Sequence, residues 1–376
     1  MSGRNANLKL TFTFRSLLVA VTFIILASLP LPSGAAAGKP HNAKLPMRYD
    51  DQMSDLAEQR HQWWTPLPVL MGDTNEVPTL LKMLSSSNPN SRARSAFLLG
   101  QIGSKATIGA LVNHLKDADQ NVRLQCGIAL ACMGDLRGIP QCAQAISISP
   151  EWMKYYAVYG LWRTNSLAGR QVLKSISAKK QGNLISAAII GALSTRYVES
   201  PVRVPASMKT SSGLTEEQVI SNAVNAFISE ADWWFHDGYY DQAIRCLHVQ
   251  VFLDPKYSEG YANMAYYEWS LGRDQRAVAI LKQGISALPN DPAMYFELGE
   301  HYYLTKNYKL AESPLNKATD LSDSVTYRKV YAHCLERLGK LKESVAQWEI
   351  LAKANPTDGA ILLNRDRVKK LIGARR

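Results

Sequence analysis

Most signatures of catalysis are missing from this chain of 376 residues. It contains no H-E-x-x-H, no G-x-S-x-G and no phosphate-binding glycine loop, which excludes the commonest zinc-protease, serine-hydrolase and nucleotide-binding motifs. Its seven histidines are scattered along the chain. In the closest pairing of an acidic residue with a histidine, Glu300 and His301, the two side chains point in different directions, because adjacent helical positions are about 100° apart. We therefore expect a protein that is not an enzyme, with no catalytic residue, no cofactor and no metal site.

Cysteine is scarce, and its pattern excludes a disulfide framework. There are five cysteines, an odd number, with no C-x-x-C pair and no cluster of histidines beside them, so a zinc site is not expected either. Each lies in an apolar helical stretch, where a thiol behaves as a small buried hydrophobe. We expect buried thiols at all five positions, with a bridge between Cys132 and Cys142 as the alternative: Cys126, Cys132, Cys142, Cys246 and Cys334.

Acidic residues are absent before Asp50, and long hydrophobic runs are absent after residue 37. The first segment has three basic residues, an apolar core over 17–31 and small residues at 35–37, which is the pattern of a secretory signal peptide. We expect residues 1–37 to direct export, to a periplasmic or secreted location. The alternative is an uncleaved N-terminal segment that anchors the chain in a membrane, although its apolar core is shorter than a spanning helix needs.

The net charge of +11 is unevenly distributed. Residues 38–195 carry 17 basic and 10 acidic residues, whereas residues 224–376 carry 20 and 19. A basic repeat surface could contact nucleic acid, but an exported protein seldom meets any, so a nucleic-acid partner is not expected. An anionic surface or an acidic partner is the more natural alternative to a merely solvated basic face.

The C-terminal part of the chain repeats every 33 or 34 residues. Prolines close three units at 255, 289 and 356, and a small residue stands twelve positions before each unit's end, at 243, 277, 311 and 344. Units of this length predict stacked helical hairpins. The pattern resembles the tetratricopeptide repeat most clearly at Tyr261, Met264, Ala265, Gly272, Ala277, Leu281, Pro289, Tyr295, Leu298, Gly299, Tyr302, Tyr308, Ala311, Leu315 and Ala318. Two departures fall in the third unit, where Lys306 replaces the glycine that turns the chain and Pro314 interrupts the second helix.

A second periodicity, of 31 residues, lies upstream. It relates Leu84 to Leu115, Arg92 to Arg123, Leu99 to Leu130 and Gly103 to Gly134, and a weaker third copy follows. The run from Asn121 to Asp135 resembles the short HEAT repeats of bilin-lyase subunits. That resemblance implies a valine between helices, an arginine bracing the turn and a glycine ending the second helix.

We therefore predict an all-α fold made of two consecutive α-solenoids, HEAT-like and then tetratricopeptide. Between them, the prolines and serines of 196–213 predict a linker, and Thr215 with Gln218 predicts a capping box at the start of the next helix. A helix is expected over 49–64. The predicted boundaries are 1–37 for the signal peptide, 38–68 for an N-terminal extension with a capping helix, 69–195 for the HEAT-like repeats, 196–217 for the linker and 218–376 for the tetratricopeptide domain, with units at 224–257, 258–291, 292–324 and 325–358 and a capping helix at 360–371.

The resemblance to tetratricopeptide arrays implies a concave groove lined by the first helix of each unit. Aromatic residues there give rigid contact area, and Lys329, His333 and Arg337 share one helix stripe, so the groove suits a peptide with one acidic end. We expect a non-catalytic adaptor that binds a protein or peptide there; the alternatives are a small ligand carried or modified by the HEAT half, or an anionic surface bound by its basic face. The predicted contact residues are Asp232, Phe235, His236, Tyr266, Trp269, Phe296, Glu300, Tyr303, Lys329, His333 and Arg337.

Overall fold

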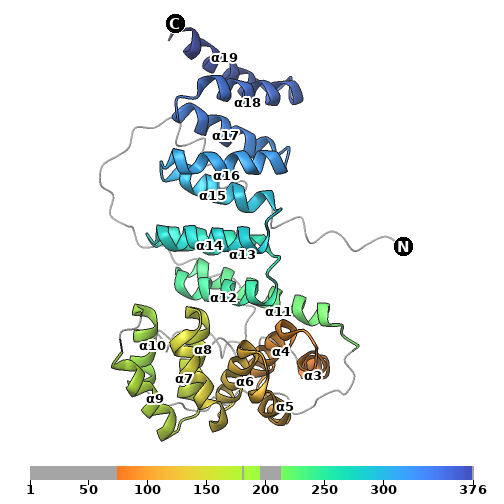
Figure 1. The fold of residues 1–376 in the computed structure, drawn as a ribbon, viewed down its shortest axis with the longest axis vertical. Coiled ribbons are helices and arrows are strands. Elements are labelled where there is room, and N and C mark those ends of the chain that lie inside the picture. The colour runs from red at the N-terminus through yellow and green to blue at the C-terminus, as the bar shows by residue number, and fades with distance from the viewer. Residues whose placement is uncertain (1–73, 180–181, 195–212, 375–376) are drawn as a thin grey trace. The chain divides into compact units, whose positions relative to one another are not determined.

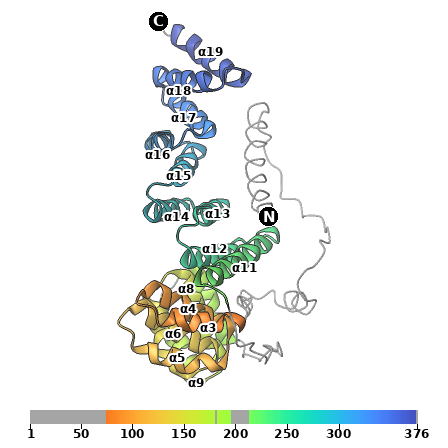
Figure 2. The ribbon, with the colours of Figure 1, turned by 90° about the vertical axis from the view of Figure 1, so that its right-hand side faces the viewer.

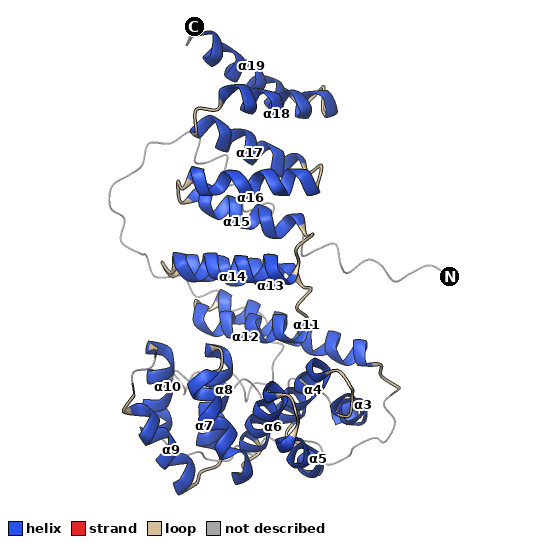
Figure 3. Ribbon diagram, in the orientation of Figure 1, coloured by secondary structure: helices blue, strands red, loops and turns tan. Residues whose placement is uncertain are grey.

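The structure is a computed structural model that describes residues 74–179, 182–194 and 213–374. Over these residues the chain forms seventeen α-helices and four short 3-10 helices, and no strand occurs among them (Figures 1 and 3). The predicted all-α architecture is confirmed. The predicted signal peptide and the helix expected over 49–64 lie outside the described residues.

The first array consists of helix pairs with a period of 31 residues. Its second helices pack in sequence, α4 on α6, α6 on α8 and α8 on α10. The α-helices are α3 (Val77–Leu84), α4 (Pro89–Ile102), α5 (Ile108–Asn113), α6 (Gln120–Cys132), α7 (Ile139–Ile148), α8 (Glu151–Arg163), α9 (Leu167–Ser177) and α10 (Asn183–Ser194), and the 3-10 helices are η1 (Thr74–Glu76), η2 (Lys105–Thr107), η3 (His114–Lys116) and η4 (Leu136–Gly138).

The end of each second helix in this array explains the glycine spacing. Gly103 and Gly134 adopt left-handed conformations, with φ of 70° and 82°, which stop the helix without a steric penalty. Asn165 stands 31 residues further on with φ of 46°, so the third copy turns in the same way with an asparagine. The sequence period therefore reflects one turn geometry used three times.

The second array consists of four helical hairpins and a final helix. Each hairpin packs on the next, and its first helices also touch, α13 on α15 and α15 on α17. Figure 2 shows α13 and α14 side by side, with α15 and α16 beyond them. The helices are α11 (Glu216–His236), α12 (Tyr240–Leu253), α13 (Ser258–Ser270), α14 (Asp274–Ala287), α15 (Pro292–Leu304), α16 (Tyr308–Leu321), α17 (Val325–Arg337), α18 (Leu341–Ala354) and α19 (Gly359–Gly373).

Small residues and a capping box set the packing of these hairpins. Ala277 and Ala311 are fully buried, which lets neighbouring helices approach closely. The predicted capping box forms at the start of α11: the Thr215 amide donates to Gln218 Oε1 at 2.8 Å, and the Gln218 amide donates to Thr215 Oγ1 at 3.2 Å. Pro314 lies inside α16 as expected, and the helix continues through it.

One hydrophobic core runs from the first array into the second. Phe97 of α4 lies 6.1 Å from Phe227 of α11 and 5.9 Å from Phe252 of α12, between ring centroids, and Trp152 of α8 lies 5.1 Å from Phe252. Around these rings, Arg94 Nε donates to the Phe252 carbonyl oxygen at 3.1 Å. The two arrays are therefore docked through buried aromatic contacts.

The cysteine prediction is settled for all five positions. Each cysteine is buried and free, so Cys132 and Cys142 form no bridge. Burial raises the pKa of the Cys132 thiol to about 12, which keeps it protonated and unreactive at neutral pH. The thiols thus serve as packing groups.

Candidate functional site

The predicted contact residues lie on the first helices of the second array. Helix α13 packs against α15, and α15 packs against α17. We call the surface formed by the exposed and half-buried predicted residues of these three helices the first-helix face: Tyr266, Trp269, Glu300, Tyr303, Lys329, His333 and Arg337. Residues of α11 approach it at Tyr267 of α13, where Phe235 stacks at 4.8 Å with the ring planes 13° apart. Phe235 is half-buried by this stacking, whereas Asp232 and His236 are exposed and face one another at 3.6 Å between Oδ1 and Nε2.

Accessible aromatic surface is concentrated on α13. Tyr266 is 39% exposed, and its ring meets the half-buried Trp269 edge to face at 6.3 Å. Trp269 in turn packs edge to face on His301 of α15 at 5.8 Å. The ring positions are fixed by these contacts, so α13 offers rigid apolar area with little conformational entropy to lose on binding.

On α15 the three predicted residues differ in accessibility. Phe296 is only 7% exposed and stacks on Tyr327 of α17 at 4.3 Å, so it belongs to the core between these helices. Glu300 and Tyr303 are half-buried. Burial raises the pKa of the Tyr303 phenol, although a hydrogen bond with Arg337 opposes the shift.

The cationic stripe predicted on α17 is largely neutralised within the chain. Lys329 Nζ pairs with Asp358 Oδ2 at 3.3 Å, at the start of α19, and His333 Nδ1 lies 3.3 Å from Glu336 Oε1. Arg337 is exposed and has no ion pair among the described residues. The accessible positive charge of the stripe therefore lies at Arg337, beside Tyr303.

Two residues outside the predicted set, Asp358 and Arg367, form ion pairs with residues of α17. Asp358 directly precedes α19 and Arg367 lies within it, and Arg367 donates to both carboxylate oxygens of Glu336, at 2.6 and 2.7 Å. They lie 29 and 31 residues from their partners along the chain, which no motif within one repeat would indicate. Only the predicted capping helix pointed to contacts there.

The interior of the second array holds polar groups that are structural. Glu268 is buried, which raises its pKa, and it lies 3.3 Å from Arg273 Nη1 and 3.7 Å from Arg276 Nη1. Glu230 is also buried with a raised pKa, and it accepts a hydrogen bond from Trp234 Nε1 at 2.9 Å. Over the described residues, no group of three or more histidine, cysteine, aspartate or glutamate side chains is placed to hold a metal ion.

An open cavity of about 760 Å³ lies between α3 and the start of α11. Its wall includes Lys82 and Glu216 and contains no histidine or cysteine. Among the helices that the structure describes, none is both long and apolar enough to cross a membrane.

Comparison with known proteins finds similarity to a family model and to solved structures. A family model of HEAT repeats matches residues 77–162. No curated protein is a significant match. Among solved structures, similarity is found to MamA (16% identity, 40% of this chain and 88% of that chain, TM-score 0.32), to YrrB, described as a tetratricopeptide protein with an unusual peptide-binding site (16%, 42% and 85%, 0.34), and to yeast Tom70 (13%, 86% and 65%, 0.36). With the hairpins described above, the chain is an all-α repeat protein in which HEAT repeats precede a tetratricopeptide-like array.

Proposed function

We propose that the chain is an exported, non-catalytic scaffold that binds a protein or peptide on the first-helix face. Repeat arrays of this kind expose long surfaces and commonly bind other proteins. The observation that carries the proposal is the combination of exposed Tyr266 and half-buried Trp269 on α13 with exposed Arg337 on α17, which makes no ion pair among the described residues. Aromatic rings and an arginine are the side chains most often found at the centre of protein interfaces.

The geometry favours a partner segment with an apolar part and an acidic part. The apolar part would lie on Tyr266 and Trp269, whose rings are held by neighbouring aromatic contacts. The acidic part would meet Arg337, since Lys329 is already paired with Asp358.

The test uses site-specific photo-crosslinking in envelope preparations. A benzoylphenylalanine at position 266 should capture a discrete partner, and one at position 310 on α16 should not, although Leu310 is 57% exposed. Purified partner should then bind the parent chain and lose at least about tenfold in affinity with Tyr266→Ala and Arg337→Glu combined. The matched control combines Leu310→Ala with Lys342→Glu, at exposed positions of second helices, and should bind normally. Capture from position 310 alone would refute the first-helix face as the binding surface.

A further inference from the structure

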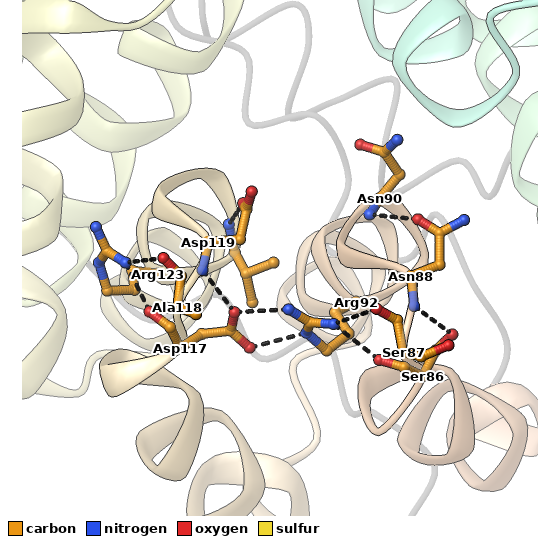
Figure 4. A network of polar contacts seen from close by, with 10 residues as sticks. Ser86, Ser87, Asn88, Asn90, Arg92, Asp117, Ala118, Asp119 and Arg123 are labelled. Carbon is orange, nitrogen blue, oxygen red and sulfur yellow. Dashed lines mark hydrogen bonds and ion pairs between the residues drawn. The ribbon is translucent and has the colours of Figure 1, made fainter.

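Arg92 in the first array makes two kinds of contact with its guanidinium group. Nη1 donates to the carbonyl oxygens of Ser86 and Ser87, at 2.8 and 3.0 Å, and so braces the turn between α3 and α4. The other edge donates to the next repeat, from Nε to Asp117 Oδ2 at 2.8 Å and from Nη2 to Asp117 Oδ1 at 2.7 Å (Figure 4). This edge-on pairing is the strongest form of the arginine–carboxylate interaction.

Among the residues that the structure describes, Arg123, 31 residues later, makes only the first kind of contact. Its Nη1 donates to the carbonyl oxygens of Asp117 and Ala118, at 2.6 and 2.8 Å, and these are the residues 31 positions after Ser86 and Ser87. Because the same nitrogen holds the equivalent pair of carbonyls, the Nε–Nη2 edge is presented as it is in Arg92. Figure 4 shows this edge directed away from the two carbonyl partners.

The residue that should receive this edge is apolar. Adding 31 to Asp117 leads to Ile148, the last residue of α7, which is 57% exposed. Among the described residues, Nε and Nη2 of Arg123 have no hydrogen bond and no ion pair, and the side chain is half-buried. An arginine edge that pairs with a carboxylate in one repeat is thus left open in the next, where the repeat period puts Ile148 at the position of that carboxylate.

We propose that this open edge of Arg123 binds a carboxylate supplied by an acidic side chain of a partner protein. The chemistry follows from Arg92, whose equivalent edge holds Asp117. Ile148 would contact an apolar residue next to the acidic one. The free energy gained by burying this apolar surface would offset the cost of dehydrating the carboxylate. This site belongs to the first array and is independent of the first-helix face.

The probe is a short fluorescent peptide with one aspartate between leucines, compared with its asparagine twin, and the readout is fluorescence anisotropy with the full chain. The parent should bind the aspartate peptide on the order of fivefold more tightly, as expected of a partly exposed bidentate pair. Ile148→Asp supplies the missing carboxylate within the chain, so it should abolish the preference. Ile148→Asn is the matched control: it removes the apolar side chain without adding charge, and the preference should remain.

Two further measurements make the test independent of folding. Arg123→Gln should also abolish the preference, whereas Arg137→Gln, at an exposed arginine of the same array, should leave it intact. Thermal melts check that each variant is folded, which matters most for Arg123→Gln because Arg123 also braces a turn. The proposal is overturned if the parent shows no preference for aspartate, or if the preference survives in Ile148→Asp. Arg123-dependent binding to phosphatidylglycerol vesicles without a peptide preference would likewise overturn it in favour of an anionic surface.

Discussion

One residue at the turn of each hairpin in the second array has the same left-handed backbone conformation. Gly238, Gly272 and Gly339 have φ of 81°, 72° and 76°, and at the equivalent place of the third hairpin Lys306 has φ of 64°. A residue with a Cβ atom pays a steric cost in this conformation that glycine does not. The turn geometry is therefore imposed by the packing of α15 on α16, against the preference of Lys306.

Replacing Lys306 with glycine should stabilise the protein by about 1 kcal/mol, because the left-handed turn then costs less. The reverse change, Gly272→Ala, should destabilise it by about the same amount. Nothing lies within 4 Å of a Cβ atom built on Gly272, so the loss would come from the backbone alone. Urea unfolding followed by circular dichroism checks both, and a Lys306→Gly midpoint at or below that of the parent would contradict the argument.

At the scale of helices, the last helix is held to the array by charge as well as by apolar packing. Ile361 and Val368 of α19 are fully buried beside Trp348, and Arg367 pairs with Glu336 of α17. Burial alone would raise the pKa of Glu336, but hydrogen bonds from His333 and Arg367 outweigh it and lower the pKa to about 2. The ionised carboxylate thus stabilises the folded state.

This pair predicts a pH-dependent stability. The folded pKa lies below the ordinary value of 4.5, so the contribution is complete above about pH 4.5 and is lost as the pH falls toward about 2. Glu336→Gln should cost about 1 kcal/mol at neutral pH, since Arg367 is partly exposed to solvent, and the difference from the parent should vanish near pH 2. Thermal melts across this range measure it.

Glu349→Gln is the control for this prediction. Glu349 pairs with Lys369 of the same helix α19, but both side chains are about half exposed, so its loss should change little at any pH. An equal effect of the two substitutions would show that the Glu336 pair has no special role.

Helix positions were predictable at this scale, but charge pairing was not. The 34-residue spacing of small residues and turn glycines located the hairpins because each unit repeats one backbone geometry. The predicted stripe of Lys329, His333 and Arg337 was placed on one helix, yet its neutralisation by Asp358 and Glu336 depends on how α19 packs.

Phe296 was expected on the surface and lies in the core, because both sides of a first helix carry aromatic residues and the repeat pattern alone does not say which side Tyr327 covers. The open edge of Arg123 was not predicted, because it follows from the Arg92–Asp117 hydrogen bonds that the structure shows.

At the scale of the whole molecule, the distribution of core residues determines which helices should unfold together. One core extends from Val77 to Leu298, and two smaller ones follow, around Leu315 and around Trp348. The linker composition left open whether the arrays dock or hinge, because docking depends on Phe97, Phe227 and Phe252, which lie far apart in sequence.

Phe97→Ala should destabilise both arrays together, by about 3–5 kcal/mol, because Phe97 is 2% exposed and its ring contacts both. Hydrogen exchange should show lost protection in α4, α8, α11 and α12 at once. Trp348→Ala removes a side chain that is just as buried, but its effect should be confined to α17, α18 and α19. Unchanged protection of α11 and α12 in Phe97→Ala would rule out a shared core.

The export expected from residues 1–37 is tested by fusing them to alkaline phosphatase, which is active only outside the bacterial cytoplasm. We expect activity in bacterial cells, with a shift in mass on cleavage after residue 37. Replacing the apolar core over 17–31 with polar residues should abolish the activity. An active fusion with no change in mass would indicate an anchor instead, and an inactive fusion would refute export.

The division of the core also determines how such a chain can change in length. A 34-residue unit inserted between α16 and α17 would meet, on both sides, surfaces made by other hairpins of the same kind, so the array could be extended there one unit at a time. The hairpin of α11 and α12 has no such freedom, because its outer side is shaped to the aromatic residues of α4 and α8. Natural or engineered variants should therefore differ in the number of later hairpins while keeping the first hairpin paired with its HEAT repeats.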